Sequence, residues 1–149
     1  MTNELSILNR LKTVIQTQLN GYLPEGFDQI GERNVIIDIP DTDQMPMKTM
    51  LYIIPNWADY EALTTENDAC TFNIAVFIVC HKDSHSSLTT KIHTYFDALQ
   101  SLIHANTSLD GEVDFSTVDN VELYYLVDGT KNTQAAEASL SVRYTKDYF

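Results

Sequence analysis

The sequence predicts an α+β domain with one mainly antiparallel sheet of about five strands and two helices packed on one face of that sheet. The predicted order of elements is α-β-β-β-α-β-β. Three observations support this fold class. A long apolar strand lies near the middle of the chain, two segments carry apolar residues at helical spacing, and the last strand alternates between apolar and polar residues.

The segment Cys70–Cys80 is expected to be the central strand. Side chains alternate between the two faces of a strand, so one face of this segment is almost wholly apolar and the other is mixed. A strand this long and apolar would promote aggregation at an exposed edge, which favours a central position. The apolar face carries Cys70, Phe72, Ile74, Val76, Ile78 and Cys80.

Two amphipathic helices are expected, at Glu4–Leu19 and Leu88–Ile103. Each has apolar residues at offsets of three and four, which form a single stripe along a helix. The first stripe is Leu5, Leu8, Leu11, Ile15 and Leu19, with Ile7 and Val14 at its borders; the second is Leu88, Ile92, Tyr95, Phe96, Leu99, Leu102 and Ile103. The second helix is expected to pack on the central strand, with a core of Phe72, Ile74, Val76, Ile78, Ile92, Phe96 and Leu99.

Four further strands complete the predicted sheet. Val35–Ile39 and Met47–Ile54 flank a short polar turn, which predicts an antiparallel hairpin. A strand at Glu112–Val127, interrupted near Asp119-Asn120, is joined to the strand Ala135–Thr145 through a turn that begins at Asp128-Gly129. The last strand points Ala136, Ala138, Leu140, Val142 and Tyr144 to one face, and the polar residues between them to the other.

The segment from Asn56 to Asp68 differs from its neighbours, because it has four acids and no apolar period. It is interpreted as an exposed loop or a partly helical excursion that is mobile until it meets a partner. Aromatic residues are enriched at interface hot spots, so a candidate interaction site is assigned here. The site consists of Trp57, Asp59, Tyr60 and Glu61. The alternative is that the two aromatic side chains simply anchor the loop to the body of the protein.

Length and composition limit the classes of function. The 149 residues fit one domain, residues 1–149. The net charge of −12 disfavours specific binding of nucleic acid, which depends on Lys and Arg. The sequence has neither an apolar run long enough to cross a membrane nor the basic start of a signal peptide, so no membrane partner and synthesis in the cytoplasm are expected.

Residue chemistry provides no convincing catalytic set, and no catalytic, cofactor-binding or metal-binding residue is assigned. The cysteines Cys70 and Cys80 would lie about 33 Å apart on one extended strand, too far to bond, and are expected to be buried thiols. His81 and His85, with Asp83 between them, have a spacing that suits a metal on a helix, but they are expected in a turn without a third ligand. Asp38, Asp41 and Asp43 lack the glycine and closing glutamate of a calcium loop. No cofactor is therefore expected, and the protein is not expected to be an enzyme.

The pattern of elements resembles the tail terminator, or tail-completion, proteins of long-tailed bacteriophages. The resemblance extends over nearly the whole chain and lies in the architecture. It comprises the opening helix, the hairpin that ends in Ile53-Ile54-Pro55, the acidic segment, the long strand Thr71–Val79, the second helix and the closing strand Ala135–Tyr144. The family has no invariant motif that could be matched residue by residue.

The resemblance implies a structural phage or prophage protein without catalytic activity. Such proteins form a homo-oligomeric ring, expected to be a hexamer, that caps the tail-tube protein, ends tube polymerisation and presents a joining surface to the head-tail connector protein. The implied location is the host cytoplasm during assembly and then the virion tail. The alternative, from a different class, is a small acidic cytosolic binding or adaptor domain. An α+β enzyme is a third and weaker alternative.

Overall fold

The computed structural model describes residues 2–40, 47–81, 88–128 and 131–148, and only the backbone of residues 124–128 and 131–132. The long helices are α1 (Glu4–Gln18) and α2 (Leu88–Ala105). Two short 3-10 helices, η1 (Leu19–Tyr22) and η2 (Glu32–Asn34), follow α1. The strands are β1 (Val35–Ile36), β2 (Thr49–Ala62), β3 (Asn67–His81), β4 (Phe115–Asp128) and β5 (Lys131–Asp147).

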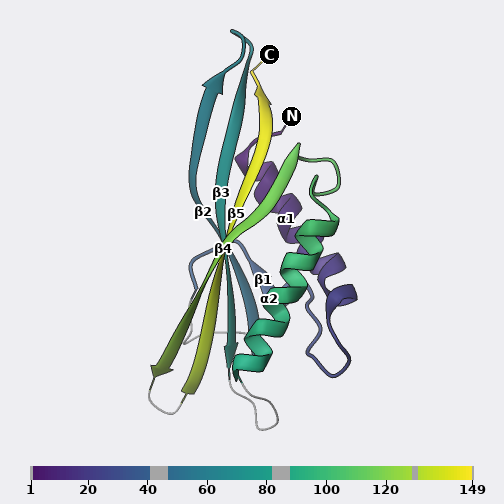
Figure 1. Ribbon diagram of the computed structural model, residues 1–149, viewed down its shortest axis with the longest axis vertical. Helices are drawn as coiled ribbons and strands as arrows, with labels where there is room; N and C mark the ends of the chain where they lie inside the picture. The colour runs from purple at the N-terminus through teal and green to yellow at the C-terminus, as the bar shows by residue number, and fades with distance from the viewer. Residues whose placement is uncertain (1, 41–46, 82–87, 129–130, 149) are drawn as a thin grey trace.

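The five strands form one sheet in the order β1-β2-β3-β5-β4, with β3 in the middle. All neighbouring pairs are antiparallel except β1 and β2. The long strands run nearly the full height of the molecule, and both helices lie on the same side of the sheet (Figure 1). The predicted fold class, order of elements and central strand are therefore confirmed.

The main core lies between the sheet and the two helices. It contains the apolar face of β3 and the stripe of α2, and all seven predicted core residues are buried in it. The inward residues of β5 complete this layer: Ala136, Ala138, Leu140, Val142 and Tyr144. We call the opposite face of the sheet, which no described helix covers, the open face.

The stripe of α1 is rotated relative to the prediction. Leu5 is 64% exposed, whereas the expected border residues Ile7 and Val14 are fully buried. Leu5 lies in the first turn of the helix, between Asn3 and Ser6, which form the N-terminal cap. The helix therefore buries Ile7 together with Leu8, and Leu5 is left on the outward side.

The predicted hairpin between Val35–Ile39 and Met47–Ile54 is wrong. The first strand has only two residues, and it pairs with β2 in the parallel direction through Val35 with Leu51 and Ile36 with Tyr52. The connection, residues 37–48, has about a dozen residues, which is long enough for the chain to return to the end of the sheet where β1 began. Residues 41–46 within it lie outside the described residues.

The interpretation of Asn56–Asp68 as a loop or helical excursion is also wrong. Strand β2 continues to Ala62 and β3 begins at Asn67, so most of this segment belongs to two paired strands. A β-bulge between Pro55 and Trp57 marks the point where the register shifts. The apolar alternation of β2 is missing beyond this bulge because its open face is exposed there and its helix face carries only Ala58, Tyr60 and Ala62.

Strand β4 begins at Phe115, three residues later than predicted, because residues 107–114 form a series of turns. Leu109, Asp110 and Gly111 have positive φ angles in this segment. The predicted interruption near Asp119-Asn120 is confirmed as a register shift between Val118 and Asn120. Asp83 and His85 fall outside the described residues, as do Asp41, Asp43 and Gly129.

Candidate interaction surface

The ends of β2 and β3 extend beyond the helices, and the end of β5 runs beside them (Figure 1). We define the projecting hairpin as Trp57–Ala62, the turn 63–66 and Asn67–Thr71. The turn is closed by the amides of Leu63 and Thr64, which both donate to the carbonyl of Asn67. All four residues of the candidate interaction site lie on this hairpin.

The structure divides the candidate site between two faces. Trp57 and Asp59 pair with Asn73 and Thr71 on the open face, whereas Tyr60 pairs with Cys70 on the helix face. Glu61 follows Asp59 by two residues and therefore also lies on the open face. The four residues do not form one patch, and only three of them remain candidates for an open-face contact.

Two exposed aromatic side chains border the outer part of the open face. Trp57 on β2 is 49% exposed and Phe115 on β4 is 46% exposed. Two cross-strand rows join them, and these rows consist of Trp57-Asn73-Ser141-Thr117 and Asp59-Thr71-Arg143-Phe115. The two strands between the aromatic residues carry mainly small polar side chains, so this part of the open face is a shallow trough. We call it the open-face trough.

The trough continues into a hollow of about 480 Å³ near the base of the projecting hairpin. Its lining includes three acids, Asp59, Glu61 and Asp114, and one cation, Arg143. Among the described residues, neither Asp59 nor Glu61 makes an ion pair or a side-chain hydrogen bond. With three acids and one cation, this part of the trough carries a net negative charge.

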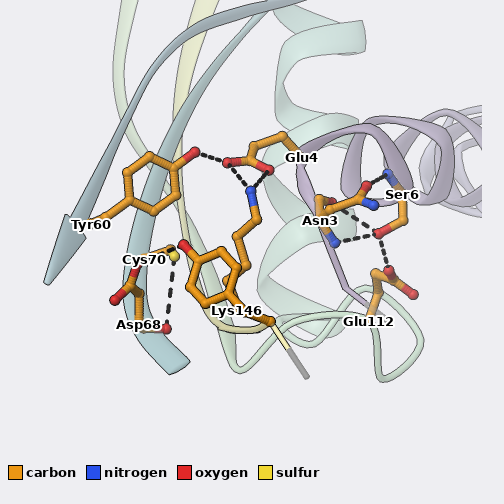
Figure 2. Close-up of polar contacts among 9 residues, drawn as sticks. Asn3, Glu4, Ser6, Tyr60, Asp68, Cys70, Glu112 and Lys146 are labelled. Atoms are coloured by element: carbon orange, nitrogen blue, oxygen red, sulfur yellow. Dashed lines mark hydrogen bonds and ion pairs between the residues drawn. The ribbon is translucent and has the colours of Figure 1, made fainter. Parts of the chain in front are cut away.

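The helix face of the hairpin is held by a polar cluster at the start of α1 (Figure 2). The Lys146 ammonium lies 3.0 Å from a Glu4 carboxylate oxygen, and the Tyr60 hydroxyl donates to the same carboxylate. Lys146 also lies 5.3 Å from the centre of the Tyr60 ring, within the range of a cation–π contact. Nearby, the Tyr148 hydroxyl donates to Asp68 at 2.6 Å. We call the contact of Glu4, Lys146 and Tyr60 the clasp.

The electrostatics of this region follow from the clasp. Burial acts to raise the pKa of Glu4, but the helix N-terminal amide and Lys146 together lower that pKa below 4.5. The hydrogen bond to Asp68 raises the pKa of Tyr148 to about 12. Burial raises the pKa of the Cys70 thiol, so this cysteine is a poor nucleophile.

No constellation for catalysis appears in the described part of the chain. Cys70 and Cys80 are buried and form no disulfide, and the imidazoles of His93 and His104 are exposed. Within the described ranges, no group of three His, Cys, Asp or Glu residues is placed to hold a metal ion. No described helix is long and apolar enough to cross a membrane.

The sequence analysis did not identify the residues that complete the open-face trough and the clasp. Asp114 and Phe115 border the trough at the start of β4 and Arg143 lies in its floor on β5, and only the strand order brings them near Asp59. Glu4 and Lys146 lie at opposite ends of the chain. The only sequence feature that pointed to the trough was Arg143, which the alternation of the last strand places on its polar side.

Comparison with known proteins gives a match at the level of structure only. No protein-family model matches the sequence, and no curated protein matches it. The fold is similar to a chain described as the sheath/tube terminator of an extracellular contractile injection system, PVC, in the extended state, with a TM-score of 0.51 and 8% sequence identity. The match covers 99% of this chain and 58% of that chain, so the protein spans little more than half the length of this terminator.

Proposed function

We propose that this protein is a structural tail terminator of a phage or phage-tail-like particle, which caps a tube as an oligomeric ring. The observation that supports the proposal is the fold match, because it covers 99% of the chain and involves a sheath/tube terminator. The phage-tail resemblance of the sequence agrees with this match. On this proposal, the partners are the tube protein and the component that joins the tube to the head.

Two features of the molecule suit such a role. The open-face trough and the projecting hairpin expose Trp57 and Phe115 together with unpaired charges, which are typical of contact surfaces. The strongly negative chain would also let DNA pass a ring without adhering, since DNA binding requires cationic side chains. We further propose that the ring is a hexamer, located in the host cytoplasm during assembly and in the tail afterwards.

The function is tested by growing tubes from purified tube protein with and without this chain. We expect tubes to stop elongating when the chain is added at a small fraction of the tube-subunit concentration, with a ring visible at one tube end by electron microscopy. A matched sample of bovine serum albumin, another acidic protein, controls for non-specific effects of charge. Tubes that elongate at the same rate with no ring at their ends would contradict the proposal and favour the adaptor alternative.

A further inference from the structure

We infer that the open-face trough of one copy receives the outward side of α1 from a second copy, so that the ring closes through a head-to-tail contact. This inference rests on the proposed ring and specifies which two surfaces form it. The charges of the two surfaces, their placement and their dimensions support this contact.

The outward side of α1 is the counterpart of the acidic trough. Its border along Gln16 carries Lys12, and the hydrogen bond from Gln16 to the carbonyl of Glu32 places exposed Arg33 alongside. Two cations, Lys12 and Arg33, therefore lie beside one acid, Glu32, along this border, in a chain with only nine basic residues. The trough has the opposite balance, with three acids and one cation.

The charges available for a contact have no partners within the described chain. Arg10, on the other border of α1, already lies 3.8 Å from Glu112 and is not counted among these charges. Among the described residues, no ion pair involves Lys12 or Arg33, just as none involves Asp59 or Glu61. A contact between these surfaces would therefore create new ion pairs without breaking ion pairs that exist within one copy.

The two surfaces lie on opposite sides of the molecule. Helix α1 packs on one face of the sheet and the trough is on the other (Figure 1). A symmetric two-fold contact would place acid against acid or cation against cation, which is repulsive. Only a head-to-tail contact joins opposite charges, and contacts of this kind repeat into rings when the rotation closes.

The dimensions of the trough suit a helix. Strands β2 and β4, which carry Trp57 and Phe115, are three strand spacings of about 4.8 Å apart, or roughly 14 Å. A helix with its side chains is about 10–12 Å across. Leu5, the outward leucine that is 64% exposed, follows the same side of α1 as Asn9 and Lys12 and would meet an aromatic border of the trough.

Reversal of charge on each surface tests the contact. One variant carries Asp59→Arg and Glu61→Arg in the trough, and the other carries Lys12→Glu and Arg33→Glu beside α1. Association is measured by sedimentation velocity at about 0.15 M salt, where a Debye length of about 8 Å screens the overall repulsion between copies but not close pairs. Each variant alone is expected to associate at least tenfold more weakly than the wild type.

An equimolar mixture of the two variants is expected to restore the ring, because each reversed surface then meets a complementary one. The reversals cancel in the mixture, so its average charge per copy equals that of the wild type and cannot explain the rescue. A matched control carries Glu25→Arg and Asp97→Arg, the same change of charge at exposed residues outside both surfaces. This control is expected to form rings, and circular dichroism establishes that every variant is folded.

The outcomes separate the inference from the proposed function. Variants that form rings as well as the wild type, while tube capping is intact, would overturn the inference and leave the function standing. Variants that form rings but no longer cap tubes would instead assign the trough to the tube protein, which also overturns the inference. A wild-type chain that stays monomeric with and without tubes would overturn both.

Discussion

Strands β2 and β3 are paired along most of their length, yet the inner and outer halves of this pair are stabilised in different ways. In the inner half, Leu51, Ile53, Val76 and Ile78 are fully buried beneath the helices. In the outer half, Trp57 and most of its neighbours in β2 are exposed. The change occurs at the bulge after Pro55.

The comparison shows that one strand pair can be core at one end and contact surface at the other. Apolar burial stabilises the inner half, at roughly 25 cal/mol for each Å² removed from water. In the outer half, Cys70 and Phe72 of β3 are still buried, whereas the exposed residues of β2 depend on backbone hydrogen bonds and on the clasp with Glu4. The open-face positions of β2 beyond the bulge are therefore the part that can change in sequence to suit a partner at little cost to folding.

The largest expected difference between the halves is in core truncation. Ile74→Ala or Phe96→Ala should lower the free energy of unfolding by about 2–5 kcal/mol, because each leaves a cavity in the main core. Trp57→Ala should change it by less than about 1 kcal/mol, since the indole is half exposed. Urea denaturation measures all three, and equal losses for Ile74→Ala and Trp57→Ala would contradict the division.

A smaller effect is expected from the clasp. Glu4→Gln should lower the stability by about 1–2 kcal/mol at pH 7, because it removes a charge-assisted contact that is only about one quarter exposed. The pKa of Glu4 is lowered in the folded state, so its contribution is present above the unfolded value near 4.5 and is lost as the pH falls through the folded value.

The measurement is urea denaturation of the wild type and of Glu4→Gln between pH 7 and pH 3. The difference between them should shrink as the pH falls, while Glu25→Gln, at an exposed residue, serves as the matched control. A difference that stays constant over this range would show that the Glu4 carboxylate is not stabilised by the clasp.

The smallest expected effect concerns local opening of the projecting hairpin. Amides of Trp57–Ala62 that pair with β3 should exchange more slowly than those of an unstructured loop, but faster than amides of Ile74–Ile78 in the centre of the sheet. Native-state hydrogen exchange at single-residue resolution measures this gradient. Complete exchange of the hairpin within the dead time would favour the earlier interpretation of a mobile segment.

Much of the fold follows from periodicity in the sequence. The faces of β3 and β5 and the stripe of α2 are local properties, since backbone geometry fixes which side chains share a side. The core predicted from them is correct at Ile74, Ile92 and Phe96. The segment that holds the candidate site was predicted as a loop and is instead the paired ends of two strands, because the exposed end of β2 shows no apolar alternation.

The sequence by itself thus determined the number and order of the main elements, the central strand and the buried faces. Tertiary structure alone decided the parallel direction of β1, the outward position of Leu5 and the union of Glu4 with Lys146 across the length of the chain. It also buried Lys91 on α2, whose ammonium lies 3.5 Å from Asp28. The physical reason is the distance along the chain over which each property is set. Side-chain alternation depends on neighbouring residues. The pairing of strands, the rotation of a helix and the burial of a charged side chain depend on which distant segments come into contact.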